Sequence, residues 1–247
     1  MTNQLHAHSR QFLYSRALRT ALLTGLLAPV IALTNGCSSL RPADNALPKF
    51  YSLDNPVTAR SQTAQTSAAA QSARLPAPTL LVSPTVAAAG FDSQRIIYTR
   101  VAHQLEYFSR SEWIDTPARM VGPLIVATLA ATDAFQAVLP ASNAAAGELR
   151  LNTEIVRLEQ DFTTQPSQLR FTLRAYILDN ATRRVVAWHA FDEVVAAASD
   201  APQDGVSAAN QAVQQGLQGL ANFCVDAAHQ WHAIKETEPN RDTISAP

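Results

Sequence analysis

Glycine and cysteine are scarce in this chain of 247 residues, which has eight glycines and two cysteines. The glycines are not spaced as a phosphate-binding loop, so no nucleotide-binding motif is present. No serine stands in a nucleophile-elbow pattern, and Cys224 has no identifiable base near it in the sequence. The sequence therefore predicts a protein that is not an enzyme and that holds no cofactor or metal.

Charged residues are also few, at 16% of the chain, while hydrophobic residues make up 47%. This balance is typical of a globular protein. The formal net charge is −1, and residues 1–36 carry three arginines and no acid. Residues 37–247 therefore hold 16 basic and 20 acidic side chains, a net charge of −4. Nucleic-acid binding needs a basic face, so nucleic acid is not an expected partner.

The N-terminal part has the pattern of a secretory signal. Residues 1–20 are polar and basic, and residues 21–33 are almost wholly apolar. Thirteen residues that include Pro29 are too few to span a bilayer, and the pattern is typical of a signal peptide. The sequence around Cys37 resembles a bacterial lipobox, in which cleavage precedes a cysteine that is then lipidated, although Thr34 replaces the preferred leucine. Ordinary cleavage, with Cys37 as an incidental thiol, is the alternative.

Lipidation of Cys37 would leave Cys224 without a partner. Cys224 stands in an apolar, helical context, where a buried small hydrophobe is expected. A disulfide between the two cysteines is the alternative. Each buried methylene of an acyl chain contributes ~0.8 kcal/mol, so several chains would hold the protein on a membrane. Ser38 is not the aspartate that usually retains lipoproteins at the inner membrane, and the resemblance implies the periplasmic face of the outer membrane.

The remaining chain predicts a single folded domain over residues 50–232, after a signal peptide (1–36) and a tether (37–49). Within the domain, residues 54–78 are rich in Ser, Thr, Gln and Ala and have little to bury. Such a stretch cannot offset its ordering entropy, so a flexible loop is expected there. Residues 233–247 are polar and predict a disordered tail.

Apolar periodicity predicts an α+β fold, in which a mostly antiparallel sheet has two helices packed on one face. The helices are expected to begin near Pro117 and to run from Val206 to Trp231. Alternation slips at Ile155-Val156, which predicts a β-bulge. The last three expected strands follow one another closely, as in an antiparallel meander. The expected strands are residues 50–53, 79–83, 96–101, 104–108, 135–139, 149–155, 169–177 and 185–194.

Residues 91–124 combine aromatic, β-branched and charged side chains in an otherwise alanine-rich chain. Tyrosine, tryptophan and arginine dominate binding hot spots, so partner contact is one interpretation of this stretch. Packing of a β-hairpin against the first helix is the other, and it is favoured for the tryptophan. The candidate partner-binding residues are Tyr98, Arg100, Tyr107, Arg110 and Trp113.

The same stretch resembles the signature of the ABC-type transport auxiliary lipoproteins, the PqiC-like family. The resemblance extends over roughly residues 50–231 and rests on the order and spacing of several residues. These are Asp92, Ser93, Arg95, Ile96, Tyr98, Arg100, Tyr107, Phe108, Arg110, Trp113 and Pro117.

The resemblance implies an accessory lipoprotein of a trans-envelope lipid transport system. Such systems pair an inner-membrane ABC permease and ATPase with a mammalian-cell-entry (MCE) domain protein. This chain would dock the MCE protein at the outer membrane, and a ring or small homo-oligomer would suit that role.

Other functions stay open on the sequence: a pilot lipoprotein for a secretion channel, a small periplasmic hydrolase, or a carrier of phospholipid in an internal cavity. A hydrolase would draw on His103 or on paired acids at Glu159 and Asp161, for which a solvated strand face is the favoured interpretation. His229 and His232 are spaced to share a helix face, as metal ligands are, but no cysteine or acidic cluster joins them. A solvated helix end is favoured there.

Overall fold

The computed structural model describes residues 47–54, 77–142 and 146–237. The chain divides after Leu47 into two compact units, and the second unit, which starts at Pro48, is the one described below. The predicted signal peptide and Cys37 lie outside the described residues, as do most of the predicted tether and of the 54–78 loop.

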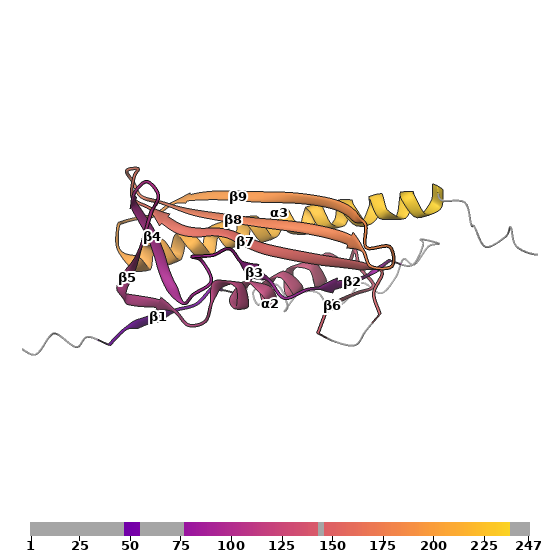
Figure 1. The fold of residues 1–247 in the computed structure, drawn as a ribbon, viewed down its shortest axis with the longest axis horizontal. Coiled ribbons are helices and arrows are strands. Elements are labelled where there is room, and N and C mark those ends of the chain that lie inside the picture. Colours follow the sequence, from indigo (N-terminus) through magenta and orange to yellow (C-terminus); the bar gives the residue numbers. More distant parts are fainter. Residues whose placement is uncertain (1–46, 55–76, 143–145, 238–247) are drawn as a thin grey trace, which may run out of the picture. The chain divides into compact units, whose positions relative to one another are not determined.

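Nine strands within the described residues form one sheet, which two helices accompany (Figure 1). The strands are β1 (Lys49–Tyr51), β2 (Thr79–Val82), β3 (Val86–Ala87), β4 (Arg95–Val101), β5 (Gln104–Trp113), β6 (Ala137–Pro140), β7 (Leu149–Asp161), β8 (Gln168–Asp179) and β9 (Val185–Ala196). The helices are α2 (Pro117–Ala130) and α3 (Pro202–Thr237).

Strand β7 connects the two parts of the sheet. It pairs in parallel with β2 near its start, with β3 at its middle and with β4 near its end. It also pairs along its length with β8, in antiparallel orientation, and β8 pairs in the same way with β9. The long ladders are therefore antiparallel, while the parallel pairings are short.

The meander of β7, β8 and β9 confirms the prediction from alternating hydrophobicity. Residues of β8 alternate without a break between half-buried and buried positions, as expected for a strand with one face on the core. The register of β7 against β8 shifts between Ile155 and Arg157, which confirms the predicted bulge. The extra residue allows Ile155 and Leu158, three positions apart, both to be buried.

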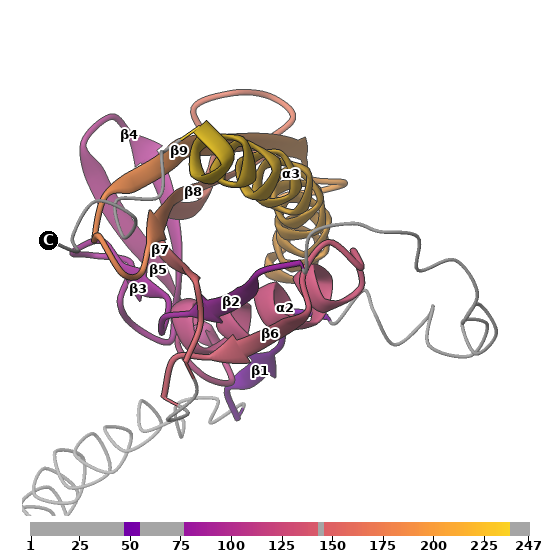
Figure 2. The ribbon, with the colours of Figure 1, turned by 90° about the vertical axis from the view of Figure 1, so that its right-hand side faces the viewer.

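Both helices lie on one side of the curved sheet (Figure 2), which confirms the predicted fold class. Helix α3 packs along β8 and β9, and α2 packs against α3, β6 and β3. Gly216 allows α3 to approach the sheet closely, since a Cβ atom there would lie 2.9 Å from Cε1 of Phe171. The side chains between sheet and helices that are fully buried include Leu149, Leu151, Ile155, Phe171, Leu173, Ile125, Leu129, Leu217 and Leu220.

Helix α2 begins at Pro117, as predicted. Proline is tolerated there because an N–H group in the first turn of a helix has no intrahelical acceptor. Pro123 lies inside this helix. Pro123 is exposed. Water can therefore reach the carbonyl that its absent N–H leaves without a bond.

Several element ends differ from the predictions. Strand β5 continues beyond Phe108 to Trp113, because its last residues pair with β1. Helix α3 begins at Pro202, before the expected start at Val206, and continues beyond the expected end at Trp231 to Thr237. Residues 233–237 are therefore helical and do not belong to a disordered tail. Neither of the described helices is long and apolar enough to cross a membrane.

Candidate functional site

Strands β4 and β5 form a hairpin that turns at Ala102-His103, as the sequence predicts. His103 adopts a positive φ of 69°, which the tight turn requires. The hairpin exposes apolar side chains on both sides of this turn, with Val101 59% and Leu105 48% exposed. An exposed apolar tip of this kind is a candidate contact surface.

Tyr98 is the centre of an aromatic cluster on the hairpin. Its ring centroid lies 4.6 Å from that of Phe108 and 5.5 Å from that of Phe162. The Arg100 guanidinium lies 4.8 Å from the Tyr98 ring centroid. The Tyr98 hydroxyl donates a hydrogen bond of 3.0 Å to Glu106, whose carboxylate is 3.9 Å from Arg100. Arg100 and Glu106 thus cover one side of the cluster with charge.

The pKa of Tyr98 is raised above its ordinary value, chiefly by burial and next by the hydrogen bond to Glu106. The positive charge of Arg100 opposes this shift without reversing it. The phenol is therefore neutral at physiological pH and serves as a hydrogen-bond donor.

A second cation–aromatic pair lies further along the hairpin. The Arg95 guanidinium is 4.0 Å from the ring centroid of Tyr107, and Tyr107 is 48% exposed. Arg110 is exposed on the same strand as Tyr107. Exposed arginine and tyrosine side chains are the residue types that anchor protein interfaces.

The five predicted partner-binding residues thus divide into two groups. Arg100, Tyr107 and Arg110 are exposed, and we call these three residues the hairpin surface. Tyr98 is 8% exposed and Trp113 is 2% exposed, and Trp113 belongs to the hydrophobic core. The Trp113 side chain packs in the core at the end of β5 and is not accessible to a partner.

Two contacts of the β4–β5 hairpin could not be predicted from the sequence, one made by Phe162 and one by Arg95. Phe162 follows β7 and is 64 residues from Tyr98, so no local pattern links the two aromatic rings. Arg95 belongs to the motif, but its stacking on Tyr107 depends on a register shift between Arg95 and Ile97 in the β4–β5 ladder.

The carboxylates of Glu159 and Asp161 have structural partners. Glu159 accepts a hydrogen bond of 3.0 Å from Thr99 and lies 3.5 Å from Arg157. It is only 8% exposed, so the predicted solvated strand face is wrong for this residue. For Asp161, burial raises the pKa, but hydrogen bonds from Thr163 and the charge of Arg170 bring it below the ordinary value. Asp161 therefore lacks the raised pKa expected of a general acid.

The remaining predicted candidates, Cys224, His229 and His232, all belong to α3. His229 is exposed and His232 half-buried, and within the described ranges no group of three or more His, Cys, Asp or Glu residues could hold a metal. Cys224 is a free, fully buried thiol, as predicted. Burial raises its pKa, so this thiol is neutral and unreactive in the folded protein.

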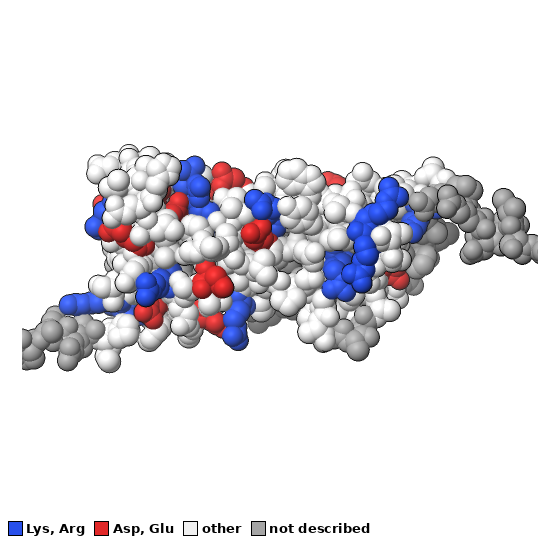
Figure 3. Space-filling view, in the orientation of Figure 1, with Lys and Arg blue, Asp and Glu red and all other residues white. Residues whose placement is uncertain are grey.

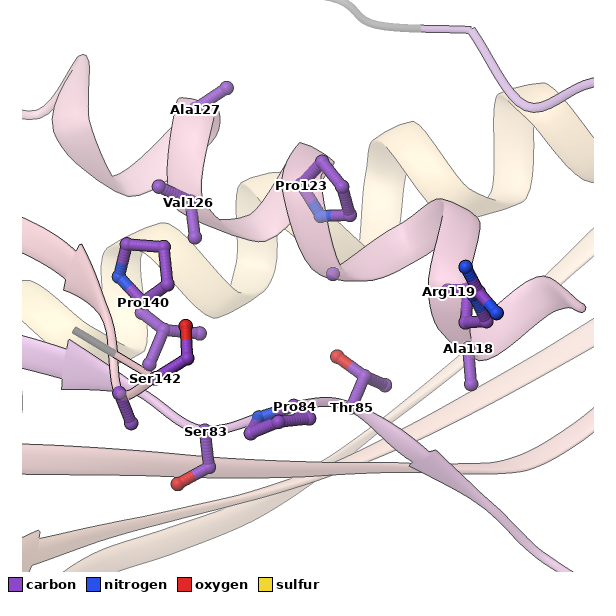
Figure 4. A pocket seen from close by; sticks show the side chains of 13 residues that line it. Ser83, Pro84, Thr85, Ala118, Arg119, Pro123, Val126, Ala127, Pro140 and Ser142 are labelled. Carbon is purple, nitrogen blue, oxygen red and sulfur yellow. The ribbon is translucent and has the colours of Figure 1, made fainter. Parts of the chain in front are cut away.

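An apolar pocket of about 480 Å³ lies between α2 and the link from β2 to β3 (Figure 4). Val126 points from the helix toward this link, and Thr85 points from the link toward the helix. Pro140 and Ser142 stand at one end and Arg119 at the other. The other residues that line it are Val82, Ser83, Pro84, Ala118, Gly122, Pro123, Ala127 and Ala141.

Charged side chains of both signs are interspersed over much of the face shown in Figure 3. Basic side chains gather at its right-hand end, near the start of β7 and the turn between β8 and β9. Arg150, Arg183 and Arg184 belong to that part of the chain. The hairpin surface lies at the other end of β7, where β4 pairs with Gln160 and Asp161.

The described residues therefore form an α+β domain with a pocket and an exposed hairpin, features that suit binding. Residues 59–221 match the family described as "ABC-type transport auxiliary lipoprotein component", and the chain belongs to that family. No curated protein sequence matches this chain.

Two crystal structures have a similar fold. Protein XCC0632 from Xanthomonas campestris is 22% identical, with a TM-score of 0.59, and the match covers 64% of this chain and 91% of that one. An uncharacterized protein is 11% identical, with a TM-score of 0.55, and the match covers 72% and 99% of the two chains. At these identities the likeness shows the fold alone.

Proposed function

We propose that this protein is a non-catalytic, lipid-anchored accessory subunit of an ABC-type system that moves phospholipid across a bacterial envelope. The observation that carries the proposal is the family match over residues 59–221. Acyl chains on Cys37 fix the chain to the periplasmic face of the outer membrane. The folded domain docks an MCE-domain protein, which links it to the inner-membrane permease and ATPase.

The hairpin surface is the docking site in this proposal. Arg100, Tyr107 and Arg110 are exposed, and the buried Tyr98 and Trp113 hold the strands that carry them. A pre-organised surface loses little conformational entropy on binding. With the protein anchored at the outer membrane, the hairpin surface binds the partner protein and no catalytic step is involved.

Crosslinking and co-purification from cells test the docking site. Arg100→Glu combined with Tyr107→Ala should lower capture of the MCE protein about 30-fold, the effect of losing a binding hot spot. Arg184→Glu is the matched control, because Arg184 is exposed in the turn at the opposite end of β7. Equal capture by the double variant and the control would show that the hairpin surface is not the docking site. Recovery of a secretin in place of an MCE protein would support the pilot alternative.

The anchor has its own test. Cys37→Ala should abolish metabolic labelling with a palmitate analogue and release the protein from membranes, since each acyl chain adds ~0.8 kcal/mol per buried methylene. The unaltered protein should fractionate with outer membranes on a density gradient. A Cys37→Ala variant that stays with membranes would contradict the lipid anchor.

A further inference from the structure

We propose that the pocket between α2 and the β2–β3 link binds one acyl chain of a free fatty acid or phospholipid. The pocket shares no residue with the hairpin surface, so the proposal goes beyond docking and adds a lipid site to the protein. Its volume of about 480 Å³ is within the range of small-molecule sites.

The walls of the pocket are made of small and rigid side chains. Three prolines, at positions 84, 123 and 140, and three alanines, at positions 118, 127 and 141, supply much of the lining. Proline and alanine have almost no side-chain freedom to lose when a ligand enters. Such a wall neither collapses into the pocket nor loses entropy on binding, so the pocket is pre-formed for an apolar occupant.

The polar groups of the pocket decide which apolar occupant fits. The Thr85 hydroxyl hydrogen-bonds to Thr153 at 2.9 Å, and the Ser83 hydroxyl accepts a hydrogen bond of 3.4 Å from Arg150. The Thr85 and Ser83 hydroxyls are therefore engaged within the protein, and the third serine or threonine of the lining, Ser142, is exposed at one end of the pocket. A bound peptide would leave most of its backbone N–H and C=O groups without partners here, which is costly. An acyl chain has no such groups along its length, and we therefore choose it over a peptide.

Arg119 places a positive charge at one end of the pocket. Its side chain is 76% exposed and forms an ion pair of 3.1 Å with Asp115, whose side chain is 39% exposed. Exposed pairs of this kind contribute little stability, so Arg119 can turn to an anionic group. The carboxylate of a fatty acid or the phosphate of a phospholipid would meet Arg119 when the chain lies in the pocket.

Gly122 provides a direct test of the site. A Cβ atom at Gly122 would have Thr85 Oγ1, at 3.7 Å, as its near neighbour. Thr85 is on the opposite wall, so a larger side chain at position 122 grows into the pocket without a clash at its base. Ala130→Leu is the matched control, because Ala130 is exposed at the end of the same helix and does not line the pocket.

The experiment measures binding of palmitate to the full chain carrying Cys37→Ala, without detergent, by native mass spectrometry and titration. One palmitate per chain should bind, and Gly122→Leu should weaken binding by about tenfold or more, since overpacking a filled site is costly. Ala130→Leu should bind as the parent does. Absence of binding, or equal affinity in the Gly122→Leu variant, would overturn the proposal.

Two further arms identify the occupant. The acylated protein, exchanged into a non-binding amphipol, should bind palmitate as the Cys37→Ala chain does. If the Cys37→Ala chain binds palmitate but the acylated protein does not, the acyl anchor of the protein itself fills the pocket. The assignment to a free lipid would then be wrong. If palmitate does not bind but Gly122→Leu lowers capture of the MCE protein, the pocket belongs to a protein contact. That result would reject the acyl site and leave the docking proposal standing.

Discussion

Replacing Asp179 by alanine should destabilise the folded domain by about 3 kcal/mol at neutral pH. Asp179 ends β8 and is only 5% exposed. Its carboxylate accepts a hydrogen bond of 2.7 Å from the Trp231 indole, which ties the end of α3 to the sheet. It also accepts bonds from the Thr182 backbone, at 2.7 Å, and the Thr182 hydroxyl, at 2.9 Å. The variant therefore leaves several donors without their acceptor.

The magnitude follows from how well each partner is shielded from water. A hydrogen bond to a charged group contributes about 1.5–3 kcal/mol net. The indole and backbone donors of Trp231 and Thr182 supply most of the total. The Lys235 ammonium, 3.4 Å from the carboxylate, adds little because its side chain is 40% exposed. For a domain of this size, about 3 kcal/mol corresponds to a fall in Tm of roughly 6–12 °C.

The stabilisation by Asp179 should depend on pH. Burial alone would raise its pKa, but hydrogen bonds from Trp231 and Thr182 and the charge of Lys235 hold the pKa well below its usual range. A carboxyl group with a lowered pKa in the folded state stabilises fully above its unfolded pKa of about 4. That stabilisation is lost as the pH falls through the folded-state pKa. The difference between parent and variant should therefore be largest at neutral pH and shrink under acid.

Urea denaturation of the Cys37→Ala chain, followed by circular dichroism at pH 7 and pH 3, measures both effects. Asp192→Ala is the control, because Asp192 is exposed and accepts one hydrogen bond, of 2.6 Å, from Thr172. The control should lose less than about 1 kcal/mol. Equal losses for the two variants, or a difference that does not shrink at pH 3, would refute the assignment of Asp179 as a charged anchor for α3.

Two further predictions concern helix packing and thiol chemistry. Gly216→Ala should destabilise the folded domain by about 1–3 kcal/mol, because the added Cβ would lie 2.9 Å from the buried Phe171 ring. Gly122→Ala should stabilise the domain by about 0.5–1 kcal/mol, because alanine has the higher helix propensity and the added Cβ meets no atom closer than 3.7 Å. Thermal denaturation checks these opposite signs, and a shift of the same sign for both would contradict the packing described. Cys224, the remaining thiol in the Cys37→Ala chain, should resist an aqueous thiol reagent until denaturant is added, since burial keeps it neutral. Rapid labelling of the native protein would show that α3 opens at this position.

Periodic segments were the predictable part of the fold. The alternation over β7 and β8, the bulge after Ile155 and the start of α2 at Pro117 are all confirmed. Each depends on neighbours within a few residues, which the sequence displays directly. Strand β3 carries no such signal, because two residues are too short to show a period. It is a strand because it pairs with β7, which is distant in the chain.

The candidate site was predictable only in part. The residue types of Tyr107 and Arg110 suggest them as candidates for partner contact, and the structure exposes both. Composition could not separate Trp113 from them, because the same aromatic residues serve cores and interfaces. The pocket has no signal in the sequence, since its prolines at 84 and 123 come from segments that meet only after folding.

The class of the fold, its long strands and helices, and the resemblance to a family can all be read from the amino-acid sequence, because they rest on local spacing. The sequence also sets the expectation that Cys37 is an anchor. The pairing of β2, β3 and β4 in turn with β7, and the exposure of particular hairpin side chains, become visible only in the folded chain. Those outcomes depend on contacts between segments distant in the chain, where burial of one face excludes the alternatives.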